Sequence, residues 1–167
     1  MSKLRDFPNF EDVDPINYLE EVALINDWEV ERSEDGCISL HVEGLWQVYT
    51  LTLMQPTSSN RFRLVSTFQI NPPNEKLGDF YKTLNLVNAK CDEGSFTYWS
   101  DKNLMVFRND FDGGEIFEIK LANAKSFLLE TVGICDRFYP AFQLTCWSNK
   151  TPEIAVGFST EYFDGEA

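Results

Sequence analysis

Between residues 28 and 70, four stretches with the pattern of β-strands follow one another, and this run constrains the fold more than any other feature. The stretches are residues 28–33, 37–44, 45–54 and 61–70. They alternate apolar and polar side chains or are rich in β-branched and aromatic residues, as half-buried strands are. Asp35-Gly36, between the first two, is typical of a hairpin turn. Because successive strands with short connections pair with each other, we predict a continuous antiparallel meander of four strands.

The fourth stretch indicates which side of this sheet is buried. One set of alternating residues is mostly apolar, namely Phe62, Leu64, Ser66, Phe68 and Ile70, and the other set contains Arg61, Arg63, Thr67 and Gln69. We therefore expect helices to pack on one face of the sheet. The other face is expected to be polar or to be covered by a partner.

Helical periodicity marks most of the other segments. The predicted helices are residues 15–27, 74–91 and 152–159, and a long helix that starts near Glu115. A second pair of strands is expected at residues 95–100 and 104–109. Pro140 cannot continue the long helix without a break or a kink, so residues 141–147 are expected to restart as a helix or to form a bent extension. Because the strands come in runs, the predicted fold class is α+β, with a twisted antiparallel sheet.

The length of 167 residues suits one domain with a sizeable core. We divide the chain into a flexible acidic arm (residues 1–14), a single α+β domain (residues 15–160) and a C-terminal tail (residues 161–167). Four cysteines without a C-x-x-C pair indicate reduced thiols rather than a disulfide framework. We find neither the apolar segment of a signal peptide nor a run of the ~18 apolar residues that a membrane span needs. We therefore expect a cytoplasmic location.

The formal net charge of −13 is distributed unevenly along the chain. Residues 1–35 hold 11 acidic and 3 basic side chains, which gives −8, and the remaining residues account for −5. Nucleic acids and anionic membrane surfaces need a basic face, so we expect neither as a partner. The acidic residues are interpreted as a solvated surface, or alternatively as a face that steers a basic protein partner.

Few residues are suited to catalysis or metal binding. His41 is the only histidine, and it lies in a predicted strand without a recognisable nucleophile motif nearby. Residues 109–115 resemble part of a calcium-binding loop, but Arg108 and Ile119 fall where that loop needs oxygen ligands. We therefore predict a protein that is not an enzyme and that has no catalytic residues, no metal and no cofactor.

Aromatic residues are the most prominent remaining feature. Most of them are expected in the core, but tryptophan and tyrosine mark protein–protein interfaces when they are partly exposed. The candidate partner-binding or interface residues are Trp46, Tyr49, Tyr139, Phe142 and Trp147.

Several motifs together resemble the YbjN family of bacterial proteins. They are NDWEVER at residues 26–32, Gly44-Leu45-Trp46, YTLTLM at 49–54, LVSTFQI at 64–70, the segment 84–109 and the segment 137–156. The most specific parts are Tyr139-Pro140-Ala141-Phe142-Gln143 and the strand pair from Trp99 to Arg108. The resemblance covers nearly the whole chain, roughly residues 16–160.

The resemblance implies a fold similar to that of type III secretion chaperones, which often form dimers and bind extended segments of other proteins. The family label is sensory transduction regulator, and no catalytic residues carry over. We therefore expect a protein-binding module, chaperone-like or regulatory, that forms a homodimer. The alternative is a small-ligand sensor with an aromatic-lined pocket between helices and sheet. Tyr139-Pro140 is expected to bend the long helix so that Phe142, Leu144 and Trp147 reach the sheet.

Overall fold

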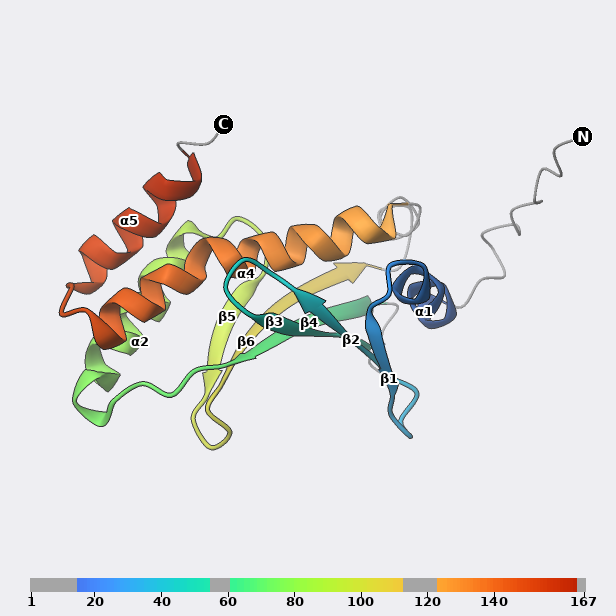
Figure 1. The fold of residues 1–167 in the computed structure, drawn as a ribbon. Helices are drawn as coiled ribbons and strands as arrows, with labels where there is room; N and C mark the ends of the chain where they lie inside the picture. Colours follow the sequence, from blue (N-terminus) through green and yellow to red (C-terminus); the bar gives the residue numbers. More distant parts are fainter. Residues whose placement is uncertain (1–14, 55–60, 113–122, 165–167) are drawn as a thin grey trace, which may run out of the picture.

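The computed structural model describes residues 15–54, 61–112 and 123–164, which form a sheet with helices packed on it (Figure 1). The elements are α1 (Pro15–Ile25), β1 (Glu29–Arg32), β2 (Ile38–Glu43), β3 (Val48–Met54), β4 (Arg61–Gln69), η2 (Asn74–Lys76), α2 (Leu77–Lys90), β5 (Ser95–Trp99), β6 (Leu104–Asp112), α4 (Ala124–Trp147) and α5 (Pro152–Asp164). This order of elements confirms the α+β fold class.

The described strands form one sheet of six strands in the order β1-β2-β3-β4-β6-β5. Every neighbouring pair in this order is antiparallel. The predicted meander is confirmed as β1 to β4, and the predicted second strand pair is confirmed as β5 and β6. β6 pairs with β4 over its whole length, from Leu104 opposite Gln69 to Asp112 opposite Arg61, which leaves β5 at the edge of the sheet.

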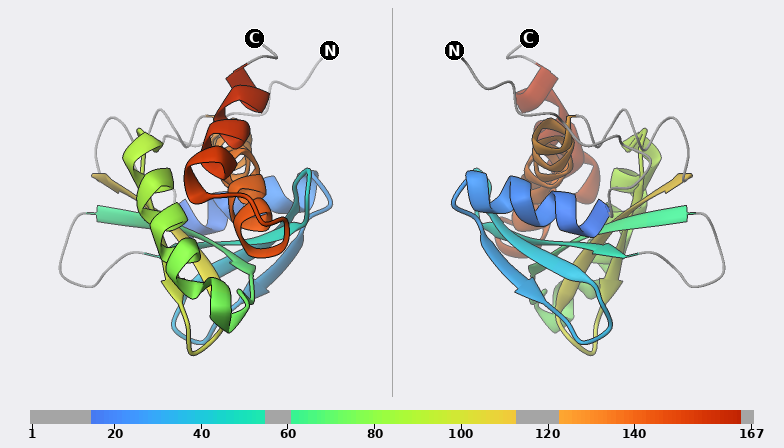
Figure 2. Two further views of the ribbon diagram at one scale, coloured as in Figure 1. Left: turned by 90° about the vertical axis from the view of Figure 1, so that its left-hand side faces the viewer. Right: turned by 90° about the vertical axis from the view of Figure 1, so that its right-hand side faces the viewer.

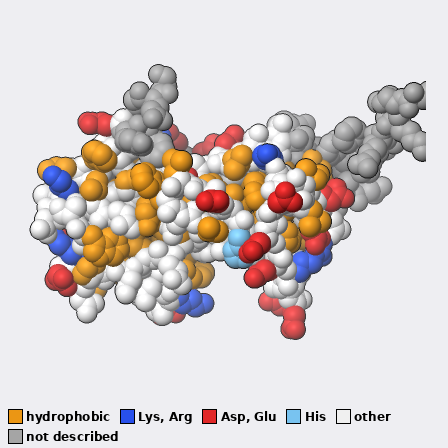
Figure 3. Space-filling view, viewed as in Figure 1, with side chains coloured by type: hydrophobic (Ala, Val, Ile, Leu, Met, Phe, Trp, Pro, Cys, Tyr) orange, Lys and Arg blue, Asp and Glu red, His pale blue; other side chains and the backbone are white. Residues whose placement is uncertain are grey.

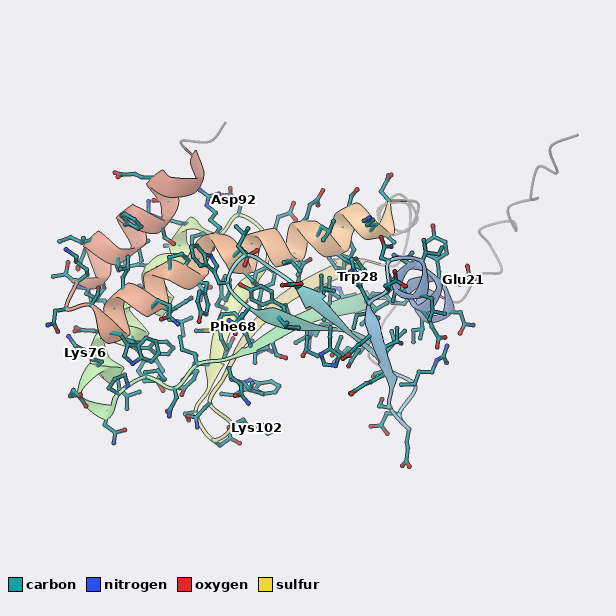
Figure 4. All side chains as sticks on the ribbon, viewed as in Figure 1. Glu21, Trp28, Phe68, Lys76, Asp92 and Lys102 are labelled. Atoms are coloured by element: carbon teal, nitrogen blue, oxygen red, sulfur yellow. The ribbon has the colours of Figure 1, made fainter. Side chains whose placement is uncertain are left out.

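The alternation predicted in β4 is confirmed by the burial of its side chains. Phe62, Leu64, Ser66 and Phe68 are buried on the face that α4 covers. Arg61, Arg63, Thr67 and Gln69 are exposed or half-buried. Figure 4 shows Phe68 between the sheet and α4.

The helices lie in a layer over one face of the sheet (Figure 2). α4 lies along the sheet and packs on β4, and α2 and α5 pack beside it and on each other. α1 packs against β1 and β2 at the other end of the sheet. The opposite face of the sheet carries mostly polar side chains, such as Thr50, Thr67 and Thr97.

Aromatic rings fill the space between α2, α4 and β5. The ring of Phe142 lies 5.6 Å from that of Phe80 and 6.0 Å from that of Phe96, between ring centroids. Phe96 also contacts Phe138, at 5.9 Å. All four side chains are buried, so this cluster forms the core at one end of the molecule.

The structure tests one of the two expectations about the long helix. α4 begins at Ala124, after the non-helical residue Asn123, and the predicted start near Glu115 lies outside the described residues. α4 continues through Pro140 to Trp147 as one helix, so of the two predicted alternatives the restart after Pro140 is wrong, and the bent extension stays a prediction. The last helix, α5, extends to Asp164 rather than to residue 159. The predicted acidic arm, residues 1–14, lies outside the described residues.

Candidate functional site

The connection between β2 and β3 lies against the middle of α4 and forms the most distinctive site of the molecule. We call residues 44–48 the hairpin tip. Three hydrogen bonds join this region to one residue of α4, Asp136. The Tyr49 hydroxyl donates to Oδ1 at 2.7 Å, and the backbone N–H of Leu45 donates to Oδ2 at 2.9 Å. The indole N–H of Trp46 donates to the backbone carbonyl of Asp136 at 3.0 Å.

The bond from Trp46 explains how α4 passes through Pro140 without a break. In an α-helix, the N–H of each residue donates to the carbonyl four positions earlier. Pro140 has no N–H, so the carbonyl of Asp136 loses its helical donor. The indole N–H of Trp46 takes the place of that donor. A residue of the hairpin tip therefore completes the hydrogen bonding of the helix.

The carboxylate of Asp136 is buried, with only 4% of the residue exposed. A buried carboxylate requires hydrogen-bond donors, which Tyr49 and the backbone of Leu45 provide. Burial and then the hydrogen bond to Asp136 raise the pKa of Tyr49 well above its usual range. The hydroxyl of Tyr49 therefore stays protonated and continues to donate.

Gly44 permits the close approach of the hairpin tip to α4. A Cβ atom at this position would lie 2.8 and 2.9 Å from the two carboxylate oxygens of Asp136 and would also overlap the ring of Tyr49. These distances are shorter than carbon and oxygen atoms allow, so only glycine fits here. The N–H of Gly44 donates to the carbonyl of Gln47 at 2.9 Å and closes the turn.

The outer surface of the hairpin tip is apolar. Leu45 is 69% exposed, Trp46 is 46% exposed and Val48 is 55% exposed. Since the indole N–H of Trp46 is used by α4, the part of this side chain that faces solvent is hydrocarbon. The hairpin tip thus holds three apolar side chains in a fixed position in solvent.

The structure brings two of the predicted site residues together, Trp46 and Tyr49, both at Asp136. However, Tyr49 and Phe142 are fully buried, so both side chains support the core and are not accessible to a partner in this structure. Tyr139 is half-buried, with its ring 5.6 Å from that of Phe68.

Trp147 lies at the surface near the end of β4, and its side chain is not part of the buried core. It is 51% exposed and lines a surface hollow together with Gln69 and Lys102. Of the five predicted interface residues, only Trp46 and Trp147 are exposed.

Sequence reasoning missed Asp136, Leu45 and Val48. Asp136 could have been noticed, because it is an acidic residue in an apolar helix, four positions before a proline whose missing N–H leaves its carbonyl unpaired. The exposure of Leu45 and Val48 depends on where the hairpin tip ends, which periodicity does not reveal.

The side chains of His41 and the buried Cys135 lie next to hydroxyl groups of the sheet. His41 lies half-buried on the polar face of the sheet, where Nδ1 is 3.2 Å from the hydroxyl of Thr50. The thiol of Cys135 is fully buried and donates to Ser66, and burial raises its pKa to about 12. A thiol with this pKa is a poor nucleophile at neutral pH. Within the described part of the chain, the His, Cys, Asp and Glu residues do not form a group of three or more that could hold a metal ion.

None of the helices in the described ranges combines the length and apolar character needed to cross a bilayer.

Comparison with protein-family models gives a match to YbjN over residues 15–144, a family described as "Putative bacterial sensory transduction regulator". Searches among curated proteins and among solved structures give no match. The matched range includes the hairpin tip, Asp136 and Pro140. The similarity to type III secretion chaperones stays a prediction.

Proposed function

The chain belongs to the YbjN family, and we propose that it is a non-enzymatic regulatory module that binds a protein partner through the hairpin tip. The observation that supports this proposal most strongly is the exposure of three apolar side chains, Leu45, Trp46 and Val48, on a loop that is fixed to α4. We further propose that the protein acts in the bacterial cytoplasm as a homodimer with a chaperone-like or regulatory role.

A fixed apolar loop is suited to binding because its conformation is set before the partner arrives. Ordering a flexible loop on binding opposes association, and the hydrogen bonds to Asp136 remove much of this cost. Tryptophan is also enriched among the residues that dominate the binding free energy of interfaces, where truncation costs about 2 kcal/mol or more. Trp46 has the properties of such an anchor.

Charge suggests a second feature of the partner, separate from the apolar contact. Exposed acidic side chains occur on and beside β1, including Glu29, Glu31, Glu34 and Asp35. Figure 3 shows acidic side chains around the end of the molecule formed by β1 and β2, while hydrophobic side chains gather over α4 and α5. The turn that holds Glu34 and Asp35 lies at the end of β2 opposite the hairpin tip, so a basic surface of the partner would have to contact the protein away from the apolar contact.

The alternative function, a small-ligand sensor, has less support. It needs a pocket between helices and sheet, and the rings of Phe80, Phe96, Phe138 and Phe142 contact one another in that space. We therefore favour protein binding over a ligand between these layers.

Site-specific photo-crosslinking in cells tests the proposal. A photoreactive benzoylphenylalanine replaces Leu45 in one variant and Ile154 in the control, which is similarly exposed but lies on α5. We expect a crosslinked protein of defined mass from position 45 and not from position 154. Addition of Val48→Ser should remove this product. A product that forms equally from both positions, or that persists with Val48→Ser, would contradict the proposal. Light scattering of the purified protein tests the homodimer.

A further inference from the structure

A second site lies on the face of the sheet opposite the helices, where β4, β5 and β6 are adjacent. It is a hollow of about 450 Å³, lined by residues that include Arg63, Ser95, Thr97, Arg108 and Asp110. The register places all five on the same face, because Arg63 is opposite Asp110 and Arg108 is opposite Ser95. The hollow is far more polar than the core, and it is separate from the hairpin tip.

Two of the charges in this hollow balance each other. Arg63 donates to both carboxylate oxygens of Asp110, at 2.6 and 2.8 Å. The hydrogen bond from Arg63, followed by the charges of Arg63, Arg61 and Arg108, lowers the pKa of Asp110 below its usual range. Asp110 is therefore ionised at neutral pH and is already satisfied by a bidentate partner.

The guanidinium of Arg108 is not balanced in this way. Its Nη2 donates to the hydroxyl of Thr97 at 3.3 Å, a long bond to a neutral acceptor. Its Nε is buried and has no hydrogen-bond partner among the described residues. The described residues also provide no carboxylate within ion-pair distance of Arg108. Arginine remains charged at every physiological pH, so the hollow carries an excess positive charge in a protein of net charge −13.

We propose that this hollow binds a small oxyanion, a carboxylate or a phosphate, with Arg108 as its principal binding residue. The planar guanidinium matches the geometry of both groups. The hydroxyls of Ser95 and Thr97 line the same hollow and can donate further hydrogen bonds to the anion. Since the overall charge of the protein repels anions at long range, recognition depends on these direct contacts. This inference concerns a different surface from the proposed protein-binding function and does not depend on it.

Titration of the ¹⁵N-labelled full chain by NMR tests the proposal. Inorganic phosphate, acetate and succinate are added separately at constant ionic strength, so that the response distinguishes phosphate from carboxylates. We expect saturable shifts of backbone amides in residues 94–97 and 108–110 with at least one of these anions. Arg108→Gln should weaken binding roughly tenfold or more, because it removes a charge-assisted contact, and Arg108→Lys should retain part of it.

Matched variants separate this site from other effects. Lys150→Gln removes one positive charge from the exposed connection between α4 and α5, and we expect the same titration as for the wild type. Amide shifts of Arg108→Gln outside the sheet should match the wild type, which shows that the variant folds. Absence of saturable shifts with all three anions, or equal binding by Arg108→Gln, would overturn the proposal.

Discussion

At the scale of single residues, Trp46 and Pro140 depend on each other although they are far apart in the sequence. Pro140 removes a donor from the carbonyl of Asp136, and Trp46 supplies another. From the sequence alone, Pro140 is expected to interrupt the helix, because the sequence pattern shows only the hydrogen-bond donors within the helix itself. The compensating donor comes from a loop whose position against α4 is a result of the tertiary fold.

Replacement of the indole by a ring without N–H tests this dependence. We expect Trp46→Phe to lower the free energy of unfolding by about 1 kcal/mol or more, since a buried carbonyl loses its donor. In a Pro140→Ala background, the new N–H of residue 140 can donate to the same carbonyl. In this background, Trp46→Phe should lower the free energy of unfolding by about 0.5 kcal/mol or more less than it does in the wild type. Urea denaturation of the four proteins measures this coupling, and equal costs in both backgrounds would rule it out.

At the scale of elements, the strands were predictable and the contact between the hairpin tip and α4 was not. Period-two alternation in β4 follows directly from the pleat of a strand, so its buried face could be identified from the sequence. The approach of Gly44 to Asp136 joins two elements that are distant in the chain, and no local pattern encodes it. For the same reason, sequence alone did not reveal that Tyr49 is buried while Trp46 is exposed.

Two glycine substitutions test this contact with a matched control. Gly44→Ala introduces a Cβ against Asp136 and Tyr49, and we expect it to lower the free energy of unfolding by about 1–3 kcal/mol. Gly133→Ala lies on the exposed side of α4, where an added Cβ meets no atom within 4 Å. It should raise stability by roughly 0.5–1 kcal/mol, as alanine favours helix interiors. If both substitutions had the same sign, the close packing at Gly44 would be refuted.

At the scale of the whole molecule, the sheet has one face covered by helices, as the sequence predicted, and one polar face, which is one of the two alternatives that the sequence left open. The two faces differ in chemistry. The helical side encloses the aromatic core and ends at the apolar hairpin tip, whereas the polar face carries the hollow around Arg108. The sequence predicted that most aromatic residues lie in the core, but their sorting into core and surface required the complete fold.

Thiol reactivity reports on the closure of the whole core. Cys135 and Cys146 are buried, and burial raises their pKa values to about 12 and about 11. At pH 8 we expect iodoacetamide to modify the half-buried Cys37 first and these two only when the protein unfolds. Mass spectrometry of peptides after timed labelling measures the order. Modification of Cys135 at the rate of Cys37 in native buffer would show that the core opens.

The central claim is that the hairpin tip binds a protein partner. Its most direct test is the affinity of the protein for the partner that crosslinking recovers, measured by calorimetry with both proteins purified. Leu45→Ser combined with Val48→Ser removes apolar surface from the hairpin tip and leaves the hydrogen bonds to Asp136 in place. We expect this variant to bind roughly tenfold more weakly or worse. Ile154→Ser combined with Phe158→Ser removes comparable exposed surface from α5 and should bind like the wild type. If instead the α5 variant loses the partner and the variant of the hairpin tip retains it, the binding surface is not the hairpin tip.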